Sequence, residues 1–189
     1  MAKMLSGMKV AALVANGFCQ EDFVASQRAM IEAGANLRIV SSEQGLVNGW
    51  QDNSWGHHFA VDAQLNTALA ADFDALIMVG GQRSCDKLRL TAHTRRFING
   101  FISAGKPVFM MGESVGMLVF TESAEGRMIC CPEAVAEMMK EAGATVENKD
   151  MMRDDNLMTC VVSDDNRDKC MQMMCDMFIE SCQPEAQAA

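Results

Sequence analysis

The 189-residue sequence contains no tyrosine, only three prolines and three histidines, and no apolar run near the length of a membrane span. A helix that crosses a bilayer needs about 20 consecutive apolar residues. The first residues, MAKMLSGMKVAALVANGF, hold an early lysine and a short apolar run but no small-residue cleavage site of the secretory kind. We therefore expect a soluble cytoplasmic protein that makes no membrane contact.

Basic residues are also scarce. The chain has 16 lysines and arginines against 25 aspartates and glutamates, a formal net charge of −9, and its basic residues are scattered. The negative charge of the chain would on average repel the phosphate backbone of a nucleic acid, so we do not expect a nucleic acid partner.

The eight cysteines lack the C-x-x-C spacing of a zinc site: Cys130 and Cys131 are adjacent, and Cys170, Cys175 and Cys182 are widely spaced. Without a secretory signal, reduced and mostly buried thiols are expected. The 18 methionines are interpreted as apolar core fillers. The chain also lacks a G-x-G-x-x-G or Walker spacing, so we expect neither a metal nor a cofactor.

Apolar runs without alternation predict strands that are covered on both faces, at residues 9–15, 73–81 and 108–111. Between them, helical periodicity predicts a helix over 20–33 with Gly34 as its C-cap, and Ser163 is expected to cap a final helix. Strand and helix alternate with short turns. We predict one α/β domain over 1–189, a mostly parallel sheet with helices on both faces, with a core at about 8–181 and a short flexible C-terminal tail.

Three polar stretches follow predicted strands: NGFCQED, VGGQRSCD and MGESVGM. Ligands in open parallel sheets bind beyond the carboxyl ends of the strands, so these stretches are expected to form the site.

The stretch GESVG, residues 112–116, has the G-x-S-x-G pattern of a serine nucleophile elbow. A serine nucleophile needs a base, and in α/β-hydrolases the histidine follows the serine. All three histidines, His57, His58 and His93, precede Ser114. The order argues against a hydrolase, although His57 or His58 could fold back toward the site. The structural alternative is that Ser114 only caps a helix.

Three stretches carry a resemblance to a known family: KVAALVANGF…EAGANLRIVSSEQG, FDALIMVGG and INGFISAGKPVFMMGESVGMLV. The chain from Lys9 to about Ile179 resembles the DJ-1/PfpI superfamily. The resemblance implies a flavodoxin-like three-layer fold, related to class I glutamine amidotransferases, and a homodimer. In active members a strained, exposed cysteine ends the elbow strand and is followed by histidine and glycine.

Set against that pattern, Ser114 stands at the cysteine and Val115 at the histidine, while Gly116 is retained. The resemblance also puts Cys19 at the position of the family's site glutamate, with Glu21 nearby. Gly80 and Gly81 match the glycine pair of the oxyanion pocket. The nucleophile, its acidic partner and the imidazole are thus all replaced, which implies a degenerate site.

The turn at Gly112-Glu113 is also similar to that in the C-terminal domain of large-subunit catalases, which lacks a nucleophilic cysteine. That likeness implies a role in stability or stress protection, with a possible small-molecule ligand in the cleft.

Three hypotheses follow. The first is a non-catalytic, stress-protective or binding protein. The second is an enzyme acting on small carbonyl or amide substrates with a rearranged centre, Cys19 and Ser114, with Glu21 and Glu113 as neighbours. The third is a redox sensor built on Cys19, Cys85 or the Cys130–Cys131 pair.

Overall fold

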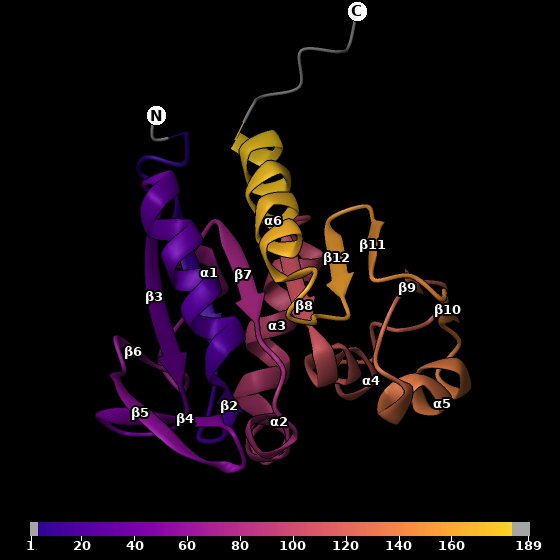
Figure 1. Cartoon of the computed structure of the whole chain (residues 1–189), viewed down its shortest axis with the longest axis horizontal. Coiled ribbons are helices and arrows are strands. Elements are labelled where there is room, and N and C mark those ends of the chain that lie inside the picture. The colour runs from indigo at the N-terminus through magenta and orange to yellow at the C-terminus, as the bar shows by residue number, and fades with distance from the viewer. Residues whose placement is uncertain (1–3, 183–189) are drawn as a thin grey trace, which may run out of the picture.

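The structure, a computed structural model, describes residues 4–182 as an α/β domain with one central sheet between two layers of helices (Figure 1). The strands are β1 Lys9–Leu13, β2 Phe18–Cys19, β3 Asn36–Ser41, β4 Leu46–Gln51, β5 Ser54–Ala60, β6 Ala63–Gln64, β7 Ala75–Met78, β8 Val108–Met111, β9 Met128–Ile129, β10 Thr145–Val146, β11 Met151–Asp154 and β12 Leu157–Cys160. The helices are α1 Gln20–Ala33, α2 Gln82–Leu88, α3 Ala92–Ser103, α4 Met117–Phe120, α5 Glu133–Glu141 and α6 Arg167–Cys182, with 3-10 helices η1 Ala70–Asp72 and η2 Gly112–Gly116.

The central sheet has the strand order β11-β12-β8-β7-β1-β3-β6. All its neighbouring strands pair in parallel except β11, which is antiparallel to β12. The fold class predicted from the sequence is therefore confirmed. Because β1, β7 and β8 are adjacent, the loops that follow them leave the same edge of the sheet.

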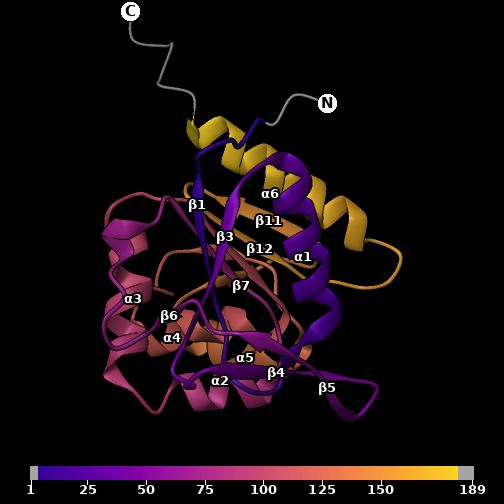
Figure 2. The same ribbon diagram turned by 90° about the vertical axis from the view of Figure 1, so that its left-hand side faces the viewer.

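Both faces of the sheet are buried, as the unbroken apolar runs predict. In β1, Val10 and Ala12 face one core while Ala11 and Leu13 face the other. Helices α1 and α6 cover the first face and bury Phe23 against it. Helix α3 covers the second, and Figure 2 shows these layers on opposite sides of the strands.

After β3 the chain forms a hairpin of β4 and β5, which joins β2 in a separate three-stranded sheet. The hairpin lies beside the N-terminal end of α1 and the end of β1 (Figures 1 and 2). It therefore forms one wall near the predicted site.

The predicted bounds of the first helix are confirmed: α1 spans Gln20–Ala33, and Gly34 ends it with φ 86°. The predicted cap of the final helix is wrong. Helix α6 begins at Arg167, four residues after Ser163, because Asn166 accepts the Ser163 N–H and the intervening residues form a turn. The predicted C-terminal tail lies outside the described residues. Within residues 4–182, no helix combines the length and apolarity that crossing a bilayer requires.

Candidate functional site at the carboxyl edge of the sheet

The loops after β1, β7 and β8 meet at the carboxyl edge of the sheet, as the sequence predicts. The Cys19 N–H donates to the Gly80 carbonyl over 2.8 Å. The Gly81 N–H donates to the Glu113 carboxylate over 2.9 Å. The glycine pair therefore lies between the loop of Cys19 and the loop of Glu113.

This meeting depends on the absence of side chains at the glycine pair. Gly81 has φ 113°, and a Cβ there would lie 2.6 Å from the Gly17 carbonyl oxygen and 2.9 Å from the Cys19 nitrogen. A Cβ on Gly80 would lie 2.7 Å from a Glu113 oxygen. Only glycine allows β2 and η2 to approach β7 this closely.

The strained residue of the elbow is Gly112, with φ 58°, directly after β8. Ser114, which the sequence interpretation put at the strained nucleophile position, lies two residues later and is fully buried. The assignment of Ser114 to the position of the family's cysteine is therefore wrong in geometry: the G-x-S-x-G pattern is present, but the sharp turn falls on its first glycine, Gly112.

The Ser114 hydroxyl is used by the backbone. It accepts the Met111 N–H over 3.1 Å and lies 2.8 Å from the Met111 carbonyl and 3.0 Å from the Met78 carbonyl. Ser114 is the third residue of η2 and reaches back to Met111, the residue before η2, as in half of a capping box. Its role is to fasten the elbow to the end of β7.

Replacing Ser114 with alanine should lower the free energy of unfolding by about 2 kcal/mol, because the buried Met111 N–H would lose its acceptor. Urea denaturation followed by circular dichroism measures this loss. Ser103→Ala, at an exposed position in α3, is the matched control and should change stability little. Equal losses in the two variants would contradict the role given to Ser114.

Val115 and Glu113 differ in where they lie. Val115 is fully buried in the core cluster on the α3 side of the sheet, so it cannot stand in the cleft where the family's histidine is expected. Glu113 is only partly buried, and its carboxylate sits against Gly80 and accepts the Gly81 N–H. One donor of the predicted oxyanion pocket is thus already bound to a carboxylate of the chain.

Cys19 is the N-cap residue of α1, with its backbone beside Gly80. Burial raises the pKa of its thiol to about 12, and the Asp22 carboxylate adds to the rise. Glu21 contributes in the same direction but least. At neutral pH the thiol is therefore protonated, which disfavours nucleophilic attack by its sulfur.

Arg167 is the residue of this region that the sequence interpretation missed. Its guanidinium donates to Glu21 over 3.1 Å, to Asp22 over 3.1 Å and to Asp164 over 2.8 Å. Partial burial alone would lower the pKa of Arg167, but the bonds to Asp164 and Asp22 raise it. The bonds to Glu21 and Asp22 fasten the start of α6 to the start of α1, whereas Asp164 holds Arg167 from its own turn.

The other candidate thiols are also poor nucleophiles. Burial raises the pKa of Cys85 to about 12 and that of Cys131 to about 11, and it raises the pKa of Cys130. Cys170 differs, since a hydrogen bond from Cys160 lowers its pKa, but both sulfurs belong to fully buried residues. The exposed thiol among the described residues is that of Cys182.

The histidine pair lies on β5 beside the start of α1. The His57 backbone N–H donates to the Gln20 side chain, and the His58 ring contacts Asn48. Within residues 4–182, no three side chains of histidine, cysteine, aspartate or glutamate are grouped to hold a metal ion.

Comparison with known proteins gives consistent similarities. The model of the DJ-1/PfpI family matches residues 8–176. General stress protein 18 of Bacillus subtilis is 30% identical over 161 residues, which cover 84% of this chain and 91% of that protein. Protein/nucleic acid deglycase 2 of Escherichia coli is 26% identical over 159 residues, or 83% of this chain and 90% of that protein.

Solved structures show the same fold. The ThiJ/PfpI domain protein of Brachyspira murdochii has a TM-score of 0.81 at 18% identity, over 93% of this chain and 98% of that one. DJ-1 of Schizosaccharomyces pombe has a TM-score of 0.76 at 16% identity, over 94% and 93% of the two chains.

Proposed function

The chain belongs to the DJ-1/PfpI family, and on that premise we propose that it is a non-catalytic member, which protects the cell under stress by binding rather than by turnover. The observation that carries the proposal is the glycine at the strained elbow position. Gly112 lies directly after β8 and has a positive φ, so it occupies the strained position at which active members of the family have their cysteine. Glycine has no side chain that could act as a nucleophile.

Two neighbouring features support the same conclusion. The Glu113 carboxylate takes the Gly81 N–H, a donor that an oxyanion would otherwise need. A carboxylate at that point would repel a developing negative charge. Both the nucleophile and the stabilisation of its transition state are thus missing from the elbow.

The alternative enzyme with Cys19 and Ser114 has less support. Ser114 is buried with its hydroxyl bonded to the backbone, and the raised pKa of Cys19 leaves little thiolate. One relative is named a general stress protein, which supports a protective role. Another is named a deglycase, which would support the alternative of an enzyme. The similarity to the C-terminal domain of large-subunit catalases remains a prediction, and so does the formation of a homodimer.

A turnover assay tests the proposal directly. The purified chain should consume neither glyoxal, as a simple reactive dicarbonyl, nor p-nitrophenyl acetate above the rate of heat-denatured protein, because no activated nucleophile is present. The deglycase of Escherichia coli serves as the positive control. Turnover that is lost in Cys19→Ser but kept in Cys182→Ser would overturn the proposal in favour of the rearranged centre.

Limiting iodoacetamide at pH 8 should label Cys182 first and Cys19 far more slowly. Only the thiolate reacts, and a pKa of about 12 leaves Cys19 almost wholly protonated until the pH rises well above 9. Mass spectrometry of each cysteine across a pH series measures this order. Selective labelling of Cys19 below pH 8 would contradict its raised pKa.

A further inference from the structure

Both tryptophans of the chain lie together on the β4–β5 hairpin, beside the carboxyl edge of the sheet. Trp50 on β4 is paired with Cys19 on β2 and with Trp55 on β5. Residues that pair directly across neighbouring strands have their side chains on the same face. Cys19, Trp50 and Trp55 therefore form one row, the tryptophan row, which runs outward from the candidate site.

The tryptophan row is open at its outer end. Trp55 is 54% exposed, and its ring meets that of Trp50 edge to face, with the ring centres 5.1 Å apart. Trp50 is only partly buried. An indole is a large and rigid apolar surface, and another aromatic ring packs well against it. The outer end of the row is therefore suited to an aromatic group.

Arg83 on α2 lies over the same row. Its guanidinium carbon is 4.4 Å from the centre of the Trp50 ring. Helix α2 packs beside β2 (Figures 1 and 2), and Gly17 allows this approach. Gly17 has φ 93°, and a Cβ there would lie 2.5 Å from the Arg83 Cβ. The fold thus holds a cation against the tryptophan row.

The N–H donors of Arg83 are left over by the fold. Stacking on an indole face orients a guanidinium but uses none of its N–H groups. In the part of the chain that the structure describes, no carboxylate pairs with Arg83. Asp86, one turn later on α2, is bonded by Gln82 and Arg89 instead. Arg83 therefore offers its planar fork of donors beside an exposed ring.

Arg95 on α3 gives the contrast within the same chain. It also lies over an aromatic ring, 5.1 Å from the centre of Phe120, but it is bonded to Glu122 over 2.9 Å. Its charge is balanced by a carboxylate of the chain. Arg83 has the same stacking without the carboxylate, which is the group that a ligand would supply.

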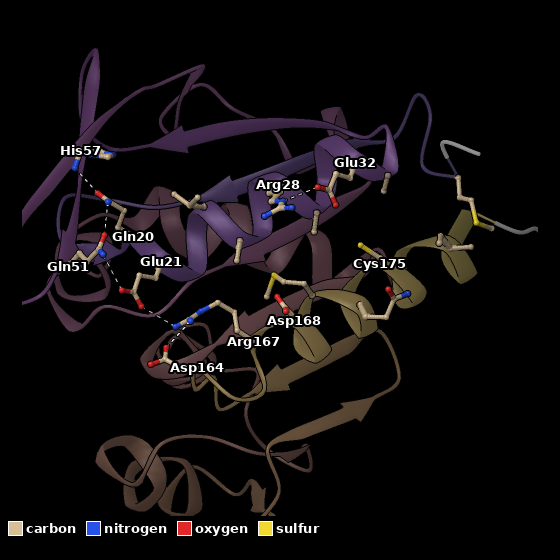
Figure 3. A pocket seen from close by; sticks show the side chains of 18 residues that line it. Gln20, Glu21, Arg28, Glu32, Gln51, His57, Asp164, Arg167, Asp168 and Cys175 are labelled. Carbon is tan, nitrogen blue, oxygen red and sulfur yellow. Dashed lines mark hydrogen bonds and ion pairs between the residues drawn. The ribbon is translucent and has the colours of Figure 1, made fainter. Parts of the chain in front are cut away.

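The hairpin that carries the tryptophans is held in place by side-chain hydrogen bonds to the start of α1 (Figure 3). The His57 N–H donates to the Gln20 side chain, which donates to Gln51. Gln51 in turn donates to Glu21. The tryptophan row is therefore ordered before a ligand arrives, which reduces the entropic cost of binding.

We propose that this surface binds a small aromatic carboxylate, with its ring on Trp55 and its two oxygens on the Arg83 guanidinium. The planar guanidinium matches a carboxylate in that geometry. The inner end of the row does not repel an anion, because the raised pKa of Cys19, about 12, keeps its thiol neutral at pH 7. A polyanion such as a nucleotide is disfavoured by the net charge of −9.

The inference rests on the proposed binding function and names its ligand class. The two fail separately. Turnover of glyoxal would refute the non-catalytic role and leave this surface as it is, whereas failure to bind an aromatic carboxylate would refute the ligand class without creating a nucleophile.

The test uses the full chain and benzoate as the probe. Because the chain has two tryptophans and no tyrosine, its intrinsic fluorescence reports on the tryptophan row. Titration should give a saturable change with a Kd below about 1 mM, and calorimetry should give the same value. Benzamide lacks the charge and cyclohexanecarboxylate lacks the aromatic ring, so each should bind several-fold more weakly. Equal binding of either analogue would overturn the proposal.

Replacing Arg83 locates the carboxylate. Arg83→Gln should weaken benzoate binding about tenfold or more and remove the preference for benzoate over benzamide. Arg83→Lys keeps the charge without the planar fork, so its affinity should fall between those of Arg83→Gln and the parent chain. Arg95→Gln is the matched control, since it removes the other stacked arginine, and it should bind benzoate as the parent chain does.

Replacing Trp55 locates the ring. Trp55→Leu should weaken benzoate binding about fivefold, measured by calorimetry, because the aromatic contact is lost. Phe120→Leu, which changes the ring beneath Arg95, is its control and should bind as the parent chain does.

Circular dichroism of each variant confirms that it is folded before binding is compared. If the Arg83 and Trp55 variants bind benzoate as their controls do, the ligand lies elsewhere and the proposal is wrong. If benzoate does not bind and the tryptophan emission shifts when the protein is diluted, a second copy of the chain covers the row, which also refutes it.

Discussion

Replacing Gly81 with alanine should lower the free energy of unfolding by about 3 kcal/mol or more, the largest loss we expect from any single methyl group in this chain. The new Cβ would lie 2.6 Å from the Gly17 oxygen, 2.8 Å from the Phe18 Cα and 2.9 Å from the Cys19 nitrogen. These are backbone atoms, so no side-chain rotation relieves the overlap. Strand β2 would have to move away from the end of β7.

Gly105→Ala is the control that separates this overlap from backbone strain. Gly105 also has a positive φ, 66°, but a Cβ there would meet no atom within 4 Å. Its replacement should cost about 1 kcal/mol, from conformation alone. Urea denaturation of both variants gives the comparison. A loss at Gly81 no larger than that at Gly105 would mean that the three loops do not pack as tightly as described.

Installing a cysteine at the elbow should create a thiol whose reactivity depends on Glu113. Gly112 has room for a side chain, since a Cβ would lie 3.4 Å from its nearest neighbour, the Gly80 Cα. The adjacent carboxylate opposes thiolate formation, so Gly112→Cys alone should react slowly with iodoacetamide at pH 7. Gly112→Cys combined with Glu113→Gln should react about tenfold faster, because a neutral amide removes roughly one pKa unit of repulsion.

Both variants are best compared in a Cys182→Ser background, which removes the exposed native thiol. Alkylation rates read by mass spectrometry at the new cysteine, between pH 6 and 9, give its apparent pKa. The rate of the combined variant should rise at lower pH than that of Gly112→Cys. Identical profiles would show that the Glu113 carboxylate does not act on the elbow, and would weaken the argument against catalysis there.

Local patterns were enough to predict much of the fold. The bounds of α1 follow from helical periodicity and from Gly34, whose left-handed φ of 86° ends the helix. Strands β1, β7 and β8 are predicted because both of their faces are buried and their sequences are apolar without a break. Their adjacency then brings the three polar loops together.

The details of the site depend on information that no local pattern holds. The sequence GESVG fits an elbow centred on Ser114, but which residue takes the positive φ is set by where β8 ends, and that residue is Gly112. Arg167 meets Asp22 across 145 positions of the chain, so its role could not be inferred from its neighbours in sequence. Its one local signal is the nearby Asp164.

The pairing of α1 with α6 also sets the order in which a nascent chain can complete its core. One face of the sheet is covered jointly by Phe23 and Met30 near the start and by Met174 and Phe178 near the end. During synthesis, most strands of that face emerge well before α6 does, so the part of their apolar surface that α6 covers stays exposed until α6 has been made. Such long-range closure slows folding and exposes intermediates to aggregation. A ribosome-bound chain of this protein should therefore depend on chaperones until α6 is released.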